Sequence, residues 1–196
     1  KNCEKLMPLI HLPVQSGSNK ILQEMNRKHT IEEYLNVIEK VKKVKQNVQF
    51  SSDFIIGYPG ETHDDFKKTI ELLNSVKFIN SYSFIYSARP GTPAFNLTNI
   101  NHDDAKKRLM DFQQTAEKIK TTYRNNLINK ISKVLFENKT KNEKKYFGRD
   151  EYFNSVIVKS ENNLIGKIEN IKILEINQNT LFGKVISNFD RKNYAA

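Results

Sequence analysis

The chain has 196 residues with 32 basic and 22 acidic side chains, which gives a formal net charge of +10. This length is enough for one large domain, or for one medium and one small domain. No apolar run approaches the roughly 20 residues that cross a bilayer, so we expect a soluble, cytoplasmic protein. One cysteine, Cys3, excludes an internal disulfide framework and a multi-cysteine metal site. The basic balance favours a polyanionic partner, although biased base composition in the source genome also explains abundant Lys and Asn.

The first half of the chain alternates strand-like and helix-like patterns. Helical periodicity follows each of the possible capping residues Ser18, Thr30 and Thr62. The apolar runs between them, typical of strands, are Pro8–Pro13, Val48–Ile56 and Phe78–Tyr86. Strands that alternate with helices indicate βαβ units, and therefore an α/β fold with a parallel sheet.

Three polar loops follow the predicted strands, at Gln15–Ser18, Gly57–Glu61 and Ser87–Thr92. The carboxyl ends of parallel strands meet at one edge of a sheet, where such folds bind ligands. The two glycines of the second loop allow close backbone approach to a ligand, yet it is neither a P-loop nor a dinucleotide fingerprint. Asp53 interrupts an apolar strand, so it is either a site residue or a polar residue of the barrel interior.

No histidine pairs convincingly with a nucleophile. His11 lies within a predicted strand and is expected to be hydrogen-bonded, while the other three, His29, His63 and His102, flank helices. Nothing near Cys3 would lower the pKa of a thiol, and no His, Asp and Glu set has metal-ligand spacing. From these residues we predict neither a catalytic group nor a metal ligand.

A long helix is predicted from Asp103 to about Asn126, with apolar residues at every third or fourth position. Its basic residues lie mostly off this stripe, on a face that is either solvated or directed at phosphates. After residue 128 about five short strands follow in sixty residues, which indicates a small antiparallel β-barrel of OB-like size. We therefore expect domains at 1–127 and 128–188, and a disordered tail at 189–196.

The turn at Asn138–Lys145 is strongly basic, and four aromatic residues follow it closely: Tyr146, Phe147, Tyr152 and Phe153. Basic groups interleaved with aromatic rings suit a surface that tracks a nucleic-acid backbone and stacks on bases. A charged hairpin whose aromatic rings turn into the core explains the same pattern. The residues alone leave both readings open.

Four blocks of sequence together resemble the radical SAM methylthiotransferases. They are His11–Ser18, Met25–Arg27, Ser52–Thr62 and Tyr82–Ala94, and the similarity continues to about residue 188. The fourth block is similar to the branch that modifies isopentenyladenosine in tRNA, with the threonylcarbamoyladenosine branch as a rival. The segments around Gly148, Asn154, Leu164 and Leu181 resemble the TRAM domain, a small RNA-binding β-barrel.

The resemblance implies a tRNA-modifying transferase that adds a methylthio group to C2 of isopentenyladenosine beside the anticodon. Its cofactors would be S-adenosylmethionine and 4Fe-4S clusters. The cluster cysteines are missing here, so the chain would be the C-terminal half of a partial β/α barrel followed by TRAM, inactive and iron-free alone. Its partners would be a tRNA anticodon stem-loop and an N-terminal cluster-bearing half, with no membrane and no DNA. The alternative is a non-catalytic RNA-binding protein.

The resemblance also implies roles for individual residues. Gln15, Ser16 and Ser18 would lie near the methionine or ribose of the cofactor. Asp53 and the turn containing Ile56, Gly57 and Glu61 would line the cofactor region, and the backbone at Tyr86 and Ser87 would face the adenine. The expected RNA contacts are Lys141, Lys144, Lys145 and Arg149.

Overall fold

The computed structural model describes residues 5–141 and 144–186. Cys3 and the predicted tail at 189–196 lie outside these ranges. The chain divides into two compact units: the first includes Ile10–Lys120, and the second begins at Thr121 and also includes Met7–Leu9. The division falls inside the long helix, ahead of the boundary that the sequence predicts at residue 127.

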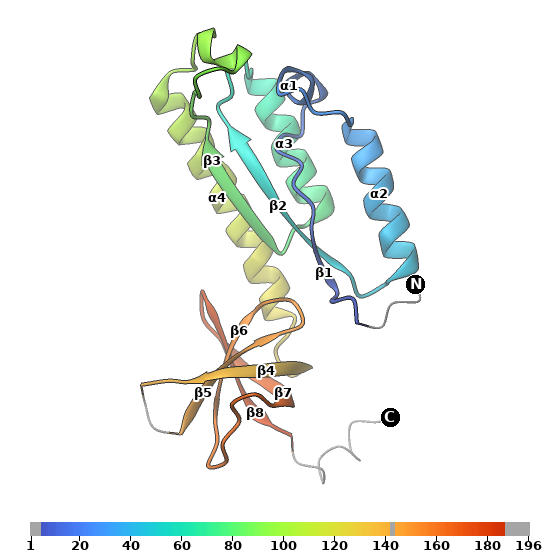
Figure 1. Ribbon diagram of the computed structural model, residues 1–196, viewed down its shortest axis with the longest axis vertical. Helices are drawn as coiled ribbons and strands as arrows, with labels where there is room; N and C mark the ends of the chain where they lie inside the picture. The colour runs from blue at the N-terminus through green and yellow to red at the C-terminus, as the bar shows by residue number, and fades with distance from the viewer. Residues whose placement is uncertain (1–4, 142–143, 187–196) are drawn as a thin grey trace. The chain divides into compact units, whose positions relative to one another are not determined.

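The first unit has the predicted alternation of strands and helices (Figure 1). Its sheet has the order β1-β2-β3, and β2 and β3 are parallel. The strands are β1 (Leu9–His11), β2 (Gln49–Ile56) and β3 (Asn80–Ile85), and the helices are α1 (Asn19–Glu24), α2 (Ile31–Val44), α3 (His63–Val76), the short 3-10 helix η1 (Pro93–Asn96) and α4 (His102–Asn125). The predicted α/β class is therefore confirmed.

Local hydrogen bonds explain where α2 and α3 begin. Thr30 accepts a hydrogen bond from the backbone N–H of Glu33, whose side chain accepts one in return, and Thr62 and Asp65 form the same reciprocal pair. Ser18 precedes α1 but makes no side-chain capping bond. Its hydroxyl is used elsewhere, as described below.

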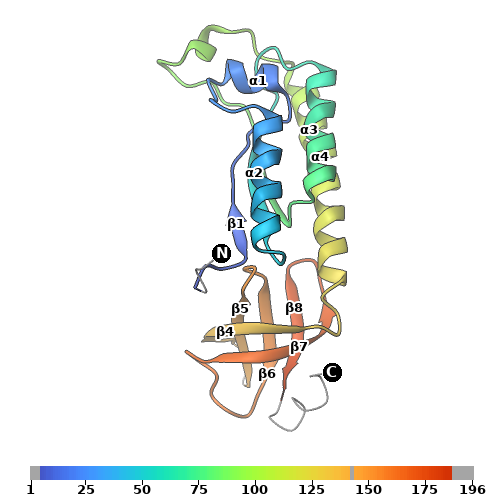
Figure 2. The ribbon, with the colours of Figure 1, turned by 90° about the vertical axis from the view of Figure 1, so that its right-hand side faces the viewer.

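Helices α2, α3 and α4 pack on one face of the sheet (Figure 2). Phe54 of β2 is fully buried between Phe78 and Phe112, with ring centroids 5.6 and 4.7 Å away. Among the described residues, no helix of this unit covers the other face, and Tyr82 and Phe84 of β3 are 55% and 60% exposed. This uncovered face is what a partial β/α barrel leaves open.

The second unit contains a closed five-stranded barrel with the order β4-β5-β6-β8-β7. Four pairings are antiparallel, and the β6–β8 pairing is parallel. This is the strand order of the OB fold, a five-stranded Greek-key barrel, and it confirms the predicted OB-like domain. The strands are β4 (Ile131–Lys139), β5 (Lys145–Asp150), β6 (Ser155–Lys159), β7 (Ile168–Ile176) and β8 (Thr180–Val185).

The sequence patterns did not mark β5 as a strand, because it begins at the basic turn and contains Gly148. That glycine is required by packing: a Cβ atom there would lie 2.4 Å from the carbonyl oxygen of Leu135 on β4. The barrel core is filled by inward side chains from all five strands, such as Phe136, Tyr146, Val156, Ile171 and Leu181. Tyr146 is thus a core residue, as one of the two sequence readings held.

Candidate functional site

A cavity of about 790 Å³ opens at the carboxyl ends of the sheet strands in the first unit. Its wall is formed by the segment after β1, the end of α1, the end of β2, and β3 with the loop that follows it. Such a volume is in the range of small-molecule and cofactor sites. The polar loops that the sequence predicts to converge do meet around this edge of the sheet.

Gln15 and Asp53 contribute two of the polar side chains that line the cavity. The backbone of Gln15 continues the line of β1 along β2, with its N–H donating to the carbonyl of Asp53 at 3.0 Å and its own carbonyl accepting from Ile55 at 2.9 Å. Gln15 has a φ of 79°, a conformation that costs a non-glycine residue about 1 kcal/mol or more. Asp53 is oriented by His11, whose Nε2 lies 3.3 Å from the carboxylate and whose Nδ1 lies 2.9 Å from Ser51 Oγ.

Aromatic rings form much of the apolar side. Tyr58 and Tyr86 meet edge to face with centroids 5.0 Å apart, and Tyr58 donates a hydrogen bond to the carbonyl of Glu24 at 2.9 Å. Phe84 lines the cavity beside them. The Tyr86 hydroxyl is buried without a hydrogen-bond partner in the part of the chain that the structure describes. A flat apolar wall with a few polar groups suits a nucleoside.

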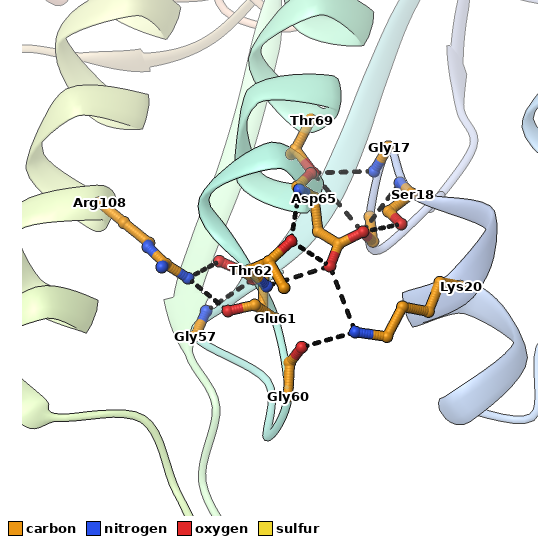
Figure 3. A network of polar contacts seen from close by, with 11 residues as sticks. Gly17, Ser18, Lys20, Gly57, Gly60, Glu61, Thr62, Asp65, Thr69 and Arg108 are labelled. Atoms are coloured by element: carbon orange, nitrogen blue, oxygen red, sulfur yellow. Dashed lines mark hydrogen bonds and ion pairs between the residues drawn. The ribbon is translucent and has the colours of Figure 1, made fainter.

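A buried carboxylate, Asp65, ties the loop after β1 to the start of α3 (Figure 3). It accepts hydrogen bonds from the hydroxyl of Ser18 at 2.6 Å and from the backbone and hydroxyl of Thr62 at 3.0 and 2.7 Å. Lys20 adds an ion pair at 3.5 Å and donates to the carbonyl of Gly60 at 2.8 Å. Burial alone would raise the pKa of Asp65, but the hydrogen bonds from Ser18 and Thr62 outweigh it and lower the pKa to about 2.

A second buried carboxylate, Glu61, holds the turn after β2. Arg108 of α4 pairs with it at 2.7 Å and also donates to its backbone carbonyl at 2.9 Å, while Gly57 donates its N–H at 3.0 Å (Figure 3). Burial raises the pKa of Glu61, and Arg108 and Gly57 oppose that rise only in part. The largely buried Glu61–Arg108 ion pair therefore holds the turn after β2 against α4.

Gly17 allows the loop after β1 to lie directly on α3. A Cβ atom at this position would stand 2.5 Å from the carbonyl oxygen of Lys68 and from the Cα of Thr69. The Gly17 N–H donates to the Thr69 hydroxyl at 2.9 Å, and Ser16 lies 3.5 Å from the same hydroxyl. This contact fixes the distance between the loop and α3, and it therefore also fixes the position of the neighbouring Gln15.

The nine residues predicted at the cofactor site separate into two groups. Four line the cavity: Gln15, Asp53, Tyr86 and Ser87. Five do not line it and instead belong to β2 or to the hydrogen-bonded supports beneath it: Ser16, Ser18, Ile56, Gly57 and Glu61. Sequence reasoning missed Asp65 and Arg108. The capping pattern Thr62-x-x-Asp65 was a usable signal for the first, whereas nothing local marked Arg108.

The low pKa of Asp65 makes the stability of the first unit depend on pH. Because the folded pKa lies below the usual value of 3.8, the stabilisation is complete above that value and is lost as the pH falls towards 2. We expect Asp65→Asn to lower the free energy of unfolding at pH 7 by about 2 kcal/mol, with the deficit shrinking below pH 4. Urea unfolding at pH 7, 4 and 2.5 measures this. A deficit that stays constant across these pH values would show that charge is not the cause.

On the barrel, the outer face of β5 and β6 presents basic and aromatic side chains. Lys145 lies directly opposite Lys159 in the β5–β6 register, and Phe147 lies opposite Ile157, which in turn lies opposite Phe182 of β8. Like charges placed directly opposite destabilise a sheet, so this pair favours a bound anion. In OB folds the face of the second and third strands, here β5 and β6, commonly binds oligonucleotides.

The four predicted RNA-binding residues are all exposed on this barrel. Lys145 and Arg149 lie on β5, and Arg149 lies over the ring of Phe147 at 5.5 Å while pairing with Glu137 at 3.4 Å. Lys141 and Lys144 lie in the β4–β5 connection, where Lys144 already pairs with Glu161 at 2.7 Å. Lys159 was missed, although the alternation of β6 places it on the same face as Ile157.

Within residues 5–141 and 144–186, no cluster of three or more His, Cys, Asp and Glu side chains is arranged to hold a metal ion. Over the same residues, the structure contains no helix with both the length and the apolar character needed to traverse a bilayer.

Comparison with known proteins identifies both parts of the chain. Residues 2–73 match the model of the Radical SAM superfamily, and residues 127–186 match that of the TRAM domain. A protein of Pelagibacter ubique named tRNA-2-methylthio-N(6)-dimethylallyladenosine synthase is 54% identical over 98% of this chain and 43% of its own length. Proteins of the same name from Wolbachia pipientis and Buchnera aphidicola are each 46% identical over 91% of this chain and 41% of their own lengths.

The chain therefore spans about two fifths of the length of these curated relatives. The two family models match in the order that the motifs predict, each on the part of the chain with the corresponding fold. The chain therefore carries a segment that matches the Radical SAM superfamily and a segment that matches the TRAM domain, and it is similar over most of its length to part of the synthases named above.

Proposed function

We propose that the chain is part of a transferase that adds a methylthio group to C2 of N6-dimethylallyladenosine (isopentenyladenosine) beside the anticodon of tRNA. The observation that carries the proposal is the cavity, which brings together Gln15, Asp53, Tyr86 and Ser87 from separate segments. These are residues of the sequence blocks that resemble the methylthiotransferases. The relatives named for this reaction supply the reaction class.

The cavity fits the nucleoside part of S-adenosylmethionine. In this proposal Tyr86 and Ser87 flank the adenine, and the Gln15 amide and the Asp53 carboxylate bind polar groups of the cofactor. When bound, the cofactor supplies radical and methyl-transfer chemistry. The residues of this chain position it and exclude water from one side.

The 4Fe-4S clusters of the family do not fit the residues of this chain. A cubane cluster needs cysteine thiolates, and the chain has one cysteine. Cluster ligands would therefore come from the remaining length of the enzyme. We propose that this cluster-bearing part covers the open face of the sheet, where Tyr82 and Phe84 are exposed beside Asp53.

The barrel would hold the tRNA anticodon stem-loop through the basic face of β5 and β6. Lysine and arginine side chains contact phosphates in such interfaces, and the exposed rings stack on unpaired bases. The expected cytoplasmic location follows from the tRNA substrate and belongs to this proposal. The proposed function requires neither a membrane nor DNA as a partner.

A chimera tests the proposal. Residues 1–196 replace the matching part of the Pelagibacter ubique relative, and the chimera is expressed in a bacterium that lacks its own synthase. We expect the methylthio derivative of dimethylallyladenosine to appear in tRNA nucleosides analysed by mass spectrometry. The same chimera with Asp53→Asn should give much less product, while Glu71→Gln, an exposed carboxylate on α3, serves as the matched control.

The other readings predict different products. Methylthio-threonylcarbamoyladenosine in place of the dimethylallyl derivative would assign the chain to the rival branch. A folded chimera that binds the anticodon stem-loop but modifies neither nucleoside would favour the non-catalytic RNA-binding protein.

A further inference from the structure

The turn between β5 and β6 places a phenylalanine where its geometry calls for glycine. The N–H of Phe153 donates to the carbonyl of Asp150 at 3.0 Å, and the N–H of Asp150 donates to the carbonyl of Asn154 at 3.1 Å. This is a three-residue hairpin loop, whose last residue adopts the left-handed conformation that suits glycine. Phe153 has a φ of 62°. For a bulky side chain this is an outlier that needs a reason.

The strain is not a consequence of a loose turn. The carboxylate of Asp150 is buried and accepts three hydrogen bonds, from the backbone of Tyr152 at 2.9 Å, from the backbone of Asn154 at 2.8 Å and from the Asn154 side chain at 2.9 Å. The turn is therefore held rigidly, and Phe153 is held with it.

Burial of the ring does not explain the residue either, because Phe153 is 59% exposed. A ring that is more than half exposed gains little from packing against the barrel. Residues that break a local rule without a gain in packing are found mainly at functional sites.

The outer face of the two strands that carry the turn indicates what the ring would bind. Arg149 lies at the turn end of β5, four residues before Phe153, with its guanidinium over the ring of Phe147, and the turn itself contains Glu151. Lys145 and Lys159 lie opposite one another at the far end of the same two strands. Exposed rings among basic side chains are the arrangement that binds single-stranded nucleic acid, where the cations contact phosphates and the rings stack on bases.

We propose that Phe153 is a stacking platform for an unpaired base of the RNA that the barrel holds. The rigid turn presents the ring in one orientation before binding, so little conformational entropy is lost when a base stacks on it. This inference rests on the proposed RNA binding. It adds a stacking contact with an unpaired base, which is separate from the phosphate contacts of Arg149 and Lys145.

The test uses the full chain and a fluorescently labelled, unmodified anticodon stem-loop, with affinity measured over a salt series. Phe153→Gly supplies the residue that the turn favours, so the melting temperature should stay the same or rise. The affinity should nevertheless fall by about 5-fold to 100-fold, since stacking on one ring has that value. The salt dependence should not change, because no charge is lost.

Two further variants separate stacking from other contacts. Phe153→Tyr keeps a flat ring and should bind like the unaltered chain, whereas Phe153→Leu keeps an apolar side chain without a ring face and should bind as weakly as Phe153→Gly. Arg149→Gln should lower the salt slope by about one unit.

The outcomes distinguish failure of the stacking proposal from failure of the RNA-binding proposal. If Phe153→Gly or Phe153→Leu binds within 2-fold of the unaltered chain while Arg149→Gln lowers the slope, the stacking platform is refuted and the RNA-binding barrel stands. If the unaltered chain shows no salt-dependent binding, the proposed RNA binding fails and the stacking platform fails with it.

Discussion

Replacing Arg108 by alanine should destabilise the first unit by about 3 kcal/mol at pH 7, because it leaves the Glu61 carboxylate buried without its cation. The two side chains are 16% and 3% exposed and lie 2.7 Å apart, so water can replace little of the lost interaction. The variant also loses the hydrogen bond to the Glu61 carbonyl and the contact of the guanidinium with the ring of Phe66.

The loss should depend on pH in a defined direction. Burial already raises the pKa of Glu61, and removal of Arg108 raises it further. An acid whose folded pKa exceeds its unfolded pKa opposes folding increasingly as the pH rises between the two values. The deficit of Arg108→Ala should therefore be largest at pH 7 and should shrink as the pH falls towards 4.5, where Glu61 becomes neutral.

Urea unfolding followed by helical circular dichroism measures this, since the helices lie almost entirely in the first unit. The double variant Arg108→Ala with Glu61→Gln should recover part of the loss, because no buried charge remains. Lys107→Ala, exposed on the same helix, is the matched control and should change the stability by less than about 0.5 kcal/mol. A double variant as unstable as the sum of the two single variants would mean that the pair is not coupled.

Removing three charges from the barrel face should have the largest effect on RNA binding. In the variant Lys145→Gln, Arg149→Gln and Lys159→Gln, the slope of log affinity against log salt should fall by roughly 2 to 3 units, and the affinity at 0.1 M salt should fall by about 100-fold or more. The reason is that each phosphate contact releases a counterion, and three such contacts are lost together.

The fold should survive this change. Lys145 and Lys159 stand opposite one another, so neutralising both removes a repulsion, which offsets the loss of the exposed Arg149–Glu137 pair. The barrel should therefore keep its stability to within about 1 kcal/mol. The matched control is Lys40→Gln, Lys43→Gln and Lys67→Gln, three exposed lysines on α2 and α3 that lower the net charge equally. An equal loss of affinity in the control would show that RNA responds to total charge and would remove the barrel face as the binding surface.

The supports beneath the cavity explain why several motif residues of the chain do not line it. Ser18 and Glu61 lie in the blocks that resemble the methylthiotransferases, yet one binds Asp65 and the other binds Arg108. Residues that hold loops in place leave the same kind of motif as residues that touch a ligand. Of the motif residues, Gln15 and Asp53 do line the cavity.

The sequence alone determined the features that depend on short stretches of chain. Helices α2 and α3 begin directly after Thr30 and Thr62 because the capping bonds join residues three positions apart. The order of strands and helices, and with it the α/β class, followed from hydrophobic periodicity. The motif blocks and the OB-like barrel were likewise visible as linear patterns, and family comparison confirmed both.

Only the tertiary structure decided which distant groups meet. Arg108 reaches Glu61 across 47 residues, and Ser18 reaches Asp65 across the same number, so no local pattern could pair them. The register of β5 against β6 set Lys145 opposite Lys159, and the turn between these strands gave Phe153 its positive φ. These arrangements follow from how the elements pack and pair, because a buried charge or a strained residue takes its partner and its role from three-dimensional neighbours.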